Sequence, residues 1–278
     1  MTDYVKDKVI VVTGAGSGFG RLVAEMTAAR GAKVVGADIN PDGIAEVQAS
    51  IGEASGTFVA EVTDVADREQ MIRLARTAVE SFGAIDVMIN NAGTMPLAFY
   101  ADHADAWQAW NRCIDINFKG VLNGISAVYD QMIAQGRGHV INISSIYGNF
   151  PVAGAAVYGA TKAAVNVLSE SLRVESQGKI KVTVVKPTGV PATGLTSSVV
   201  NRAGTIGVVG QNFPTFMVNA GKLVEGTLSG PDIDEHSVKY WAIEPRHLAE
   251  KIVYVIDQPW GVSIGDITVR ATGENYIL

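Results

Sequence analysis

Residues 140–162 read VINISSIYGNFPVAGAAVYGATK, and they predict a strand, a loop and a helix in direct succession. Three of the first four residues are apolar and β-branched, which is typical of a short, fully buried strand. Gly148 and Pro151 then break the regular structure. From Tyr158 onward apolar residues recur at helical spacing, so Tyr158 and Lys162 are expected one turn apart on the same helix face.

This pairing of a tyrosine with a lysine has a chemical use. A free phenol titrates near 10 and is a poor base at neutral pH. A cation at roughly 4 Å, in an effective dielectric of about 20, favours the phenolate by about 4 kcal/mol. We therefore predict that Lys162 lowers the pKa of Tyr158, that Tyr158 acts as an acid or base, and that Ser145 hydrogen-bonds the same substrate oxygen. The same spacing at Tyr4 and Lys8 lies in a charged N-terminal segment without a serine strand before it, and we interpret it as chance.

A second motif lies near the start of the chain. Residues 8–13 (KVIVVT) predict a buried strand, which is followed at once by a turn that contains Gly14, Gly18 and Gly20 and then by a helix through Arg30. Glycines let the backbone turn tightly and approach a pyrophosphate, which binds the free N–H groups at the start of the helix. The pattern therefore predicts a nucleotide site.

An acidic residue follows the second predicted strand, at residues 33–37. Asp38 comes about twenty residues after the glycine turn, where a carboxylate accepts hydrogen bonds from an adenosine ribose. The sequence Asp-Ile-Asn-Pro also fits the cap and first turn of a helix. Both interpretations are compatible.

The remaining chain alternates between strand and helix patterns. Further strands are expected at 57–61, 83–89, 139–144, 180–186 and 265–270, and further helices at 68–82, 104–132 and 158–177. Asn117 is a poor residue for a helix interior, and it predicts a local break in the long helix. This alternation predicts an α/β fold over residues 1–278, with a single Rossmann-type, doubly wound parallel sheet and helices on both faces.

Composition excludes several other classes of protein. The 278 residues are 47% hydrophobic with a net charge of −6, and no basic block suggests a nucleic-acid partner. No apolar run is long enough to span a membrane, and the N-terminus is too charged for a signal peptide, so a cytoplasmic protein is expected. One cysteine, Cys113, and four scattered histidines offer no metal-ligand spacing, so no metal is expected.

Taken together, the motifs resemble those of the short-chain dehydrogenase/reductase family, in that family's order, from about Lys6 to Thr193. They comprise the glycine turn after Thr13, Asp64-Val65, Asn90-Asn91-Ala92-Gly93, Asn117, Ser145, Tyr158 with Lys162, and Pro187. The resemblance implies that Tyr158 is the catalytic acid/base and that Lys162 lowers its pKa. It also implies that Ser145, thirteen positions before Tyr158, orients the substrate, and that Asn117 anchors a proton relay.

The same resemblance assigns a set of residues to a nicotinamide dinucleotide. They are Gly14, Ser17, Gly18, Phe19, Gly20, Asp38, Ile39, Asp64, Val65, Asn91, Ala92, Gly93, Tyr158, Lys162, Pro187, Gly189, Val190 and Thr193. The chain departs from the family at three places: Phe19 replaces an isoleucine, Thr188 replaces a glycine with a longer loop to Thr193, and residues 271–273 replace a paired-glycine ending. Asp38 would repel a 2′-phosphate, and neither the glycine turn nor the residues just after the second strand are basic, so NAD is expected over NADP. Arg21, in the first turn of the helix, is the nearest cation in sequence and leaves room for a modest activity with NADP.

By resemblance, residues 194–241 form a wall and lid over the substrate. Apolar residues in and near this segment suggest a pocket for a hydrophobic or bulky alcohol or ketone, although they equally fit burial against the core. The pocket residues proposed from the sequence are Met95, Tyr147, Phe150, Phe213, Phe216 and Met217. The long helices at 104–132 and 158–177 resemble those of the family's dimer face, which implies a homo-oligomer, either a dimer or a tetramer.

Three rival functions fit less well. Gly261-Val-Ser263-Ile-Gly265 matches a hydrolase nucleophile elbow, but no helix pattern and no histidine follow it. A sugar-nucleotide epimerase of the extended branch usually has a longer C-terminal domain. A dinucleotide-binding sensor without catalysis predicts the loss of Ser145, Tyr158 or Lys162, and all three are present.

Overall fold

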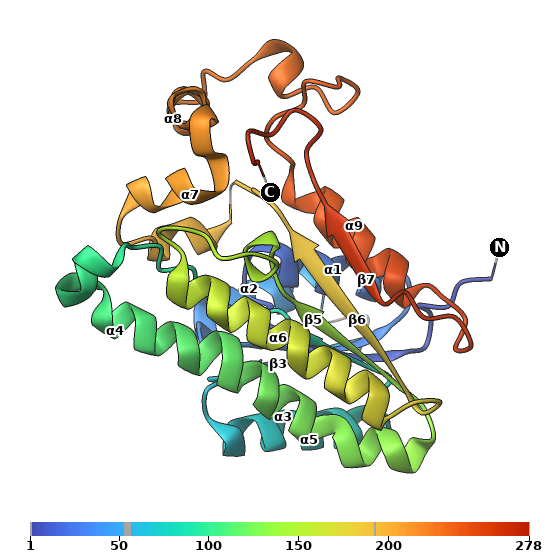
Figure 1. Ribbon diagram of the computed structural model, residues 1–278. Coiled ribbons are helices and arrows are strands. Elements are labelled where there is room, and N and C mark those ends of the chain that lie inside the picture. Colours follow the sequence, from blue (N-terminus) through green and yellow to red (C-terminus); the bar gives the residue numbers. More distant parts are fainter. Residues whose placement is uncertain (1, 53–56, 192, 278) are drawn as a thin grey trace.

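The computed structural model describes residues 2–52, 57–191 and 193–277, and within them seven parallel strands form one sheet. The strands lie in the order β3-β2-β1-β4-β5-β6-β7 (Figure 1). Their bounds are β1 Val9–Thr13, β2 Lys33–Asp38, β3 Phe58–Val62, β4 Val87–Asn90, β5 Gly138–Ile143, β6 Ile180–Pro187 and β7 Asp266–Val269. The predicted doubly wound parallel sheet is confirmed.

The direction of winding reverses next to β1. This strand pairs with β2 on one side and with β4 on the other, so the chain builds the sheet outward in both directions from this point. In doubly wound sheets the crevice at such a reversal, beyond the carboxyl ends of the strands, is where ligands bind. The glycine turn after β1 and the Asn91–Gly93 turn after β4 both open there.

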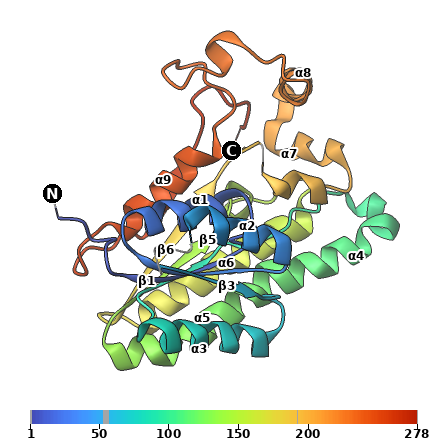
Figure 2. The ribbon, with the colours of Figure 1, turned by 180° about the vertical axis from the view of Figure 1, so that it is seen from behind.

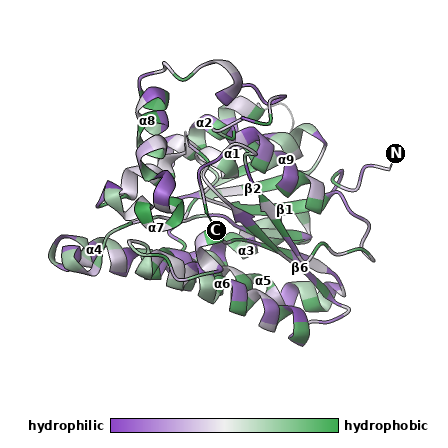
Figure 3. Ribbon diagram, turned by 45° about the horizontal axis from the view of Figure 1, so that its top comes forward, coloured by the Kyte–Doolittle hydropathy of each residue, from purple (hydrophilic) through white to green (hydrophobic). Residues whose placement is uncertain are grey.

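Helices cover both faces of the sheet, as Figures 1 and 2 show from opposite sides. One apolar cluster joins the sheet to α1 (Gly18–Ala29), α2 (Pro41–Ile51) and α9 (Pro245–Ile256). A second cluster joins the other face to α3 (Arg68–Phe82), α5 (Gly120–Gln135) and α6 (Ala156–Glu175). Because both faces are covered, the central strands are apolar on both sides, and β1 is green along its length in Figure 3.

The predicted helix over residues 104–132 is interrupted at its centre. Helix α4 (His103–Cys113) passes through a π-helical turn, Ile114–Lys119, into α5. In this wider turn the Gly120 N–H bonds to the Asp115 carbonyl five residues back. The predicted local break at Asn117 in the long helix is therefore confirmed, and it takes the form of a π-helical turn.

The chain between β6 and α9 lies above the carboxyl edge of the sheet (Figure 1). It contains the short helix α7 (Ile206–Val209), the longer helix α8 (Phe213–Val224) and several 3-10 turns. After β7 the chain returns to this same edge, where the Ile277 N–H donates to the Val208 carbonyl of α7 at 2.9 Å. Residues from three distant parts of the sequence thus meet above the sheet.

Candidate active site

Ser145, Tyr158 and Lys162 come together where β5 ends and α6 begins. Ser145 has an extended backbone and caps the 3-10 turn that follows β5, while Tyr158 and Lys162 occupy the first two turns of α6. The three residues are only 5%, 3% and 5% exposed. The structure therefore buries all three side chains in one place at the carboxyl edge of the sheet.

The two adjacent serines have different partners. Ser144 donates its hydroxyl to the Lys162 carbonyl oxygen at 3.1 Å, which ties the end of β5 to α6. The Ser145 hydroxyl oxygen accepts the Tyr147 N–H at 3.3 Å and hydrogen-bonds the Tyr158 hydroxyl. The geometry thus supports Ser145, rather than Ser144, as the serine that acts with Tyr158.

The pKa of Tyr158 is set mainly by burial and not by the neighbouring lysine. Burial raises its pKa above the ordinary value, the Ser145 hydrogen bond partly offsets the rise, and nearby Cys113 adds to it. The predicted lowering by Lys162 is wrong, because the Lys162 Nζ lies 5.8 Å from the centre of the tyrosine ring and donates to the Ile143 carbonyl at 2.8 Å. Burial also lowers the pKa of Lys162 to about 8. Tyr158 therefore keeps its proton and can donate it.

Asn117 links the strand-end loop after β4 to α6. Its side-chain oxygen accepts the Thr94 N–H at 2.9 Å, and its amide nitrogen donates to the Thr94 carbonyl at 2.9 Å and to the Thr161 hydroxyl at 3.2 Å. Gly93 lies between these groups: a Cβ there would be 3.4 Å from the Asn117 Oδ1 and 3.7 Å from the Lys162 Nζ. The missing side chain keeps backbone accessible beside the catalytic candidates.

The glycine turn after β1 leaves a cradle at the start of α1. Gly14 and Gly18 have φ of 65° and 54°, in the left-handed region that favours glycine. A Cβ at Gly20 would lie 2.1 Å from the Gly14 carbonyl oxygen. Ser17 caps α1 without a side-chain hydrogen bond and the first turn has no acidic residue, so no side chain of the cap satisfies the first N–H groups of the helix. This arrangement fits a pyrophosphate, while Phe19 packs against the apolar core.

Asp38 lies at the end of β2, beside the glycine turn. Its two carboxylate oxygens accept the Gly16 N–H and the Asn40 N–H, each at 2.9 Å. The Asp-Ile-Asn-Pro sequence does begin α2, and its cap is Asn40, which accepts two N–H groups of the first turn. Ile39 is half exposed at 51%. The carboxylate is thus held where the sequence predicted a ribose site.

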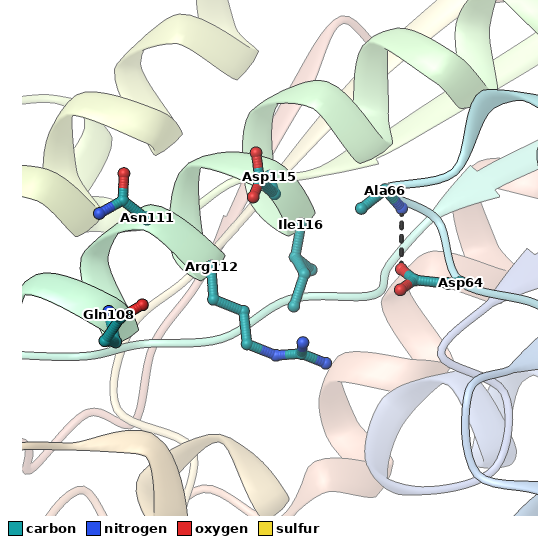
Figure 4. A pocket seen from close by; sticks show the side chains of 7 residues that line it. All are labelled: Asp64, Ala66, Gln108, Asn111, Arg112, Asp115 and Ile116. Atoms are coloured by element: carbon teal, nitrogen blue, oxygen red, sulfur yellow. Dashed lines mark hydrogen bonds between the residues drawn. The ribbon is translucent and has the colours of Figure 1, made fainter.

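The loop after β3 borders a cavity of about 380 Å³ that opens beside α4 (Figure 4). Val65 is buried and packs closely on Gly120, while the Asp64 carboxylate accepts the Ala66 N–H at 3.0 Å. The Arg112 side chain extends across the opening in Figure 4 and makes no hydrogen bond or ion pair with another described residue. The lining residues are Asp64, Ala66, Gln108, Asn111, Arg112, Asp115 and Ile116. Sequence analysis missed Arg112, because a single exposed arginine on a helix is not a signal.

The loop after β6 comes close to both the glycine turn and the C-terminal segment. Thr188, directly after Pro187, donates its N–H and its hydroxyl to the Val269 carbonyl, both at 3.3 Å. The Thr193 Cβ lies 4.0 Å from the position that a Cβ would take at Gly18, and Val190 packs against the core. Ala192, within the loop whose extra length was noted in the sequence, lies outside the described residues.

Comparison with known proteins supports the assignment that these motifs suggest. The family model for the short chain dehydrogenases matches residues 8–203. The chain belongs to the short-chain dehydrogenase family. It is 34% identical over 274 residues to an uncharacterized oxidoreductase of Staphylococcus saprophyticus, covering 98% of each chain. It is also 34% identical to an uncharacterized oxidoreductase of Listeria monocytogenes, covering 98% of this chain and 99% of the relative.

Solved structures share the fold of this short-chain dehydrogenase. A serine dehydrogenase in complex with NADP+ is 26% identical, with a TM-score of 0.75 and 94% of both chains covered. A short-chain dehydrogenase/reductase of Burkholderia phymatum in complex with NAD is 27% identical, with a TM-score of 0.74, and the match covers 96% of this chain and 90% of that one. The chain is therefore an oxidoreductase with a fold that binds nicotinamide dinucleotides.

An apolar cluster surrounds Tyr158 in this short-chain dehydrogenase. Four of the six pocket residues proposed from the sequence belong to it: Met95, Tyr147, Phe213 and Phe216. The Tyr147 and Tyr158 rings meet edge to face, with 5.5 Å between their centroids. Phe150 and Met217 lie outside the cluster and are 55% and 39% exposed, so their contact with a substrate stays a prediction.

The cluster also contains a residue that sequence analysis missed. Tyr276, from the C-terminal segment, packs against the same apolar side chains as Tyr158. No pattern in the sequence indicates this contact, because it joins residues that are far apart along the chain. Sequence analysis placed the substrate cover at 194–241 and did not include the C-terminal segment.

Among the residues that the structure describes, no group of three or more histidine, cysteine and acidic side chains is placed to hold a metal ion. In the same part of the chain no helix has both the length and the apolar character needed to cross a bilayer.

Proposed function

We propose that this short-chain dehydrogenase interconverts a secondary alcohol and a ketone, with NAD as the hydride carrier. The observation that carries the proposal is the burial of Ser145, Tyr158 and Lys162 together at the carboxyl edge of the sheet, next to the Gly93 backbone. A sensor that only binds a dinucleotide would not need a buried, hydrogen-bonded Ser145–Tyr158 pair.

The residues around Tyr158 have distinct proposed tasks. Tyr158, which the structure keeps protonated, donates its proton to the carbonyl oxygen of a ketone that is reduced, and in alcohol oxidation the ionised form of Tyr158 takes the hydroxyl proton back. Ser145 hydrogen-bonds the same oxygen and orients it. Lys162, whose pKa is lowered to about 8, is still mostly protonated at neutral pH, so it places a positive charge beside the reaction centre. Asn117 holds Thr94 in place, and so positions the loop beside Gly93.

The residues proposed to bind the cofactor have separate tasks at the carboxyl edge of the sheet. The N–H groups at the start of α1 would hold the pyrophosphate, and the cradle at Gly14 and Gly20 has no room for a Cβ. Asp38 would hold the adenosine ribose, and the Asp64–Val65 loop would lie beside the adenine. When bound, the nicotinamide supplies the hydride acceptor for alcohol oxidation and the donor for ketone reduction.

Two observations favour NAD over NADP. The Asp38 carboxylate is fixed beside Gly16, where it would face a 2′-phosphate. Arg21, the cation nearest to the turn in sequence, is held by Glu25 at 3.0 Å and reaches Glu46 at 3.4 Å. Its charge is therefore already compensated.

The apolar surroundings of Tyr158 favour a hydrophobic substrate. Tyr147, Phe213 and Phe216 belong to the same cluster, and a ligand pocket of this kind is lined mostly by apolar and aromatic side chains. The alternative is that these residues only bury each other. Higher kcat/KM on apolar secondary alcohols than on small polyols would support the pocket, and the reverse order would contradict it.

The test of the proposed reaction is Tyr158→Phe, which removes only the hydroxyl. We expect kcat to fall by about 10² to 10⁴-fold, because proton transfer is lost, while the Kd of NADH stays within about twofold. Steady-state kinetics on a secondary alcohol and fluorescence titration with NADH measure the two quantities. Tyr254→Phe is the matched control, since Tyr254 is 53% exposed on α9. Near-normal turnover of Tyr158→Phe would overturn the proposal.

A further inference from the structure

The C-terminal segment, residues 271–277, crosses the carboxyl edge of the sheet and pairs with the chain that covers it (Figure 1). The Gly273 N–H donates to the Tyr240 carbonyl at 2.8 Å, and the Ile277 N–H donates to the Val208 carbonyl at 2.9 Å. The segment therefore lies against residues both before and after α8.

Side chains fix the segment from two further directions. The Asn275 side-chain oxygen accepts the Trp241 indole N–H at 2.5 Å, and its carbonyl accepts the Asn212 amide at 2.9 Å. Glu274 bonds to the Thr188 hydroxyl in the loop after β6 and to Arg270 at 2.6 Å. These contacts on both sides of the segment hold the next residue, Tyr276, in a defined position.

Tyr276 places its ring and its hydroxyl at the proposed reaction centre. The ring packs in the cluster of Tyr147 and Tyr158, and its centroid lies 6.2 Å from that of Phe216. The hydroxyl oxygen lies 2.6 Å from the position that a Cβ would take at Gly189. Only glycine at that position leaves room for the hydroxyl, so the end of the chain and the loop after β6 fit together.

The Tyr276 hydroxyl is a hydrogen-bonding group without a partner. Within the described residues no hydrogen bond to it is formed, although its neighbours in the cluster are mostly apolar. Burial raises the pKa of Tyr276, and Glu274 and Tyr158 add to the rise, so the group stays a neutral hydroxyl. Tyr276 is half-buried, and its hydroxyl is not among the buried polar atoms that lack a partner, so this oxygen is open to water or to a substrate oxygen that takes the place of water.

We infer that Tyr276 determines substrate specificity: its ring closes the apolar pocket beside Tyr158, and its hydroxyl hydrogen-bonds a second oxygen of the substrate. The inference rests on the proposed function. It narrows the substrate class to apolar alcohols and ketones that carry a further carbonyl or hydroxyl oxygen, away from the carbon that is oxidised or reduced. Tyr276 positions this substrate and does not transfer the proton.

Matched ketones test the inference. Cyclohexanone is compared with 1,4-cyclohexanedione, and 2-hexanone with 2,5-hexanedione, as substrates for reduction by NADH. Wild-type protein should prefer the dione of each pair. Tyr276→Phe keeps the ring, and it should lower kcat/KM for the diones by about tenfold while the values for the monoketones change by less than about twofold. The Kd of the diones in the presence of NAD+, where no turnover occurs, should rise by the same factor.

The controls separate the inference from the proposed function. Tyr254→Phe should leave every value unchanged, and thermal unfolding checks that Tyr276→Phe is folded. The inference alone would be overturned if Tyr276→Phe lost kcat/KM equally on both ketones of a pair, bound NADH more weakly, or showed no change. It would also be overturned if wild-type protein reduced the monoketones but neither dione. Wild-type protein that reduces no ketone would overturn the proposed function itself.

Discussion

At the scale of single residues, burial decides the protonation of the proposed catalytic groups. Tyr158 and Lys162 are both buried, and burial penalises the charged form of each. The neutral phenol and the lysine with a lowered pKa are therefore the consequence of one environment. Shifted pKa values are common at functional sites, because catalysis uses ionisable groups whose charged form is costly to bury.

The lowered pKa of Lys162 leads to a prediction on stability. Since its pKa is about 8 in the folded protein and near 10.4 in an unfolded chain, the unfolded chain holds more protons between these values. The cost of the buried charge is therefore fully present below about pH 8, and it is released as the pH rises toward 10. We expect Lys162→Met to raise the free energy of unfolding by about 1 to 3 kcal/mol at pH 7, and by less at pH 10.

Urea unfolding at the two pH values measures this difference. Lys179→Met is the control, because Lys179 is exposed after α6 and its replacement should change stability by less than about 0.5 kcal/mol. A stability gain in Lys162→Met that is the same at pH 7 and pH 10 would contradict the prediction. Lys162→Met should also have a lower kcat, because the lysine that destabilises the fold is needed for the reaction.

Asp38 carries a second prediction at this scale. Wild-type protein should show a kcat/KM for NAD that exceeds the value for NADP by more than about tenfold, since a fixed carboxylate faces the 2′-phosphate. Asp38→Asn removes the charge and should narrow this ratio by about tenfold. Asp42→Asn, on the exposed first turn of α2, should leave the ratio near its original value. Equal values for the two cofactors in the wild type would show that Asp38 does not face the ribose.

At the scale of elements, tertiary contacts modify what local propensity favours. The π-helical turn between α4 and α5 turns Asn117 inward, where it satisfies both backbone groups of Thr94. Irregular helical turns of this kind are frequent at functional sites. The C-terminal segment has little regular structure of its own, and its position comes from hydrogen bonds to the loop after β6 and to the chain around α8.

At the scale of the whole molecule, the outer faces of α4 and α6 expose apolar side chains. Trp107 and Ile114 lie two turns apart along α4 and the π-turn, and are 61% and 38% exposed. Val167 and Val174 lie two turns apart on α6, and are 67% and 75% exposed. Apolar residues at this spacing form a stripe that a second copy of the chain would cover. We propose that these helices form the interface of a dimer or tetramer.

Light scattering tests this assembly. The chain has a mass of 29.3 kDa, and we expect a mass in solution of two or four times this value. The double variant Val167→Asp and Val174→Asp should lower the mass to that of one chain, because it places charges in an apolar interface. Val238→Asp is the control, because Val238 is 78% exposed in the segment 194–241, away from α4 and α6, and this change should leave the mass unchanged. Wild-type protein with a mass near 29.3 kDa would contradict the assembly.

The sequence by itself determined the sheet, the family and the proposed catalytic residues. Buried strands, the glycine turn and the spacing of Tyr158 and Lys162 are local patterns, and each depends on residues that are neighbours along the chain. Element boundaries moved by a few residues, and the break at Asn117 was visible because asparagine disfavours a helix interior.

Only the tertiary structure decided which side chains act on one another across the chain. The pKa of Tyr158 depends on how deeply the fold buries it, and burial is a property of packing and not of spacing. Within Asp-Ile-Asn-Pro, the structure makes Asn40 the helix cap, while the Asp38 carboxylate bonds to Gly16 in the turn that follows another strand. Tyr276 packs near Tyr158 because the chain after β7 returns to the carboxyl edge of the sheet. No local sequence pattern predicts a contact between residues so far apart in sequence.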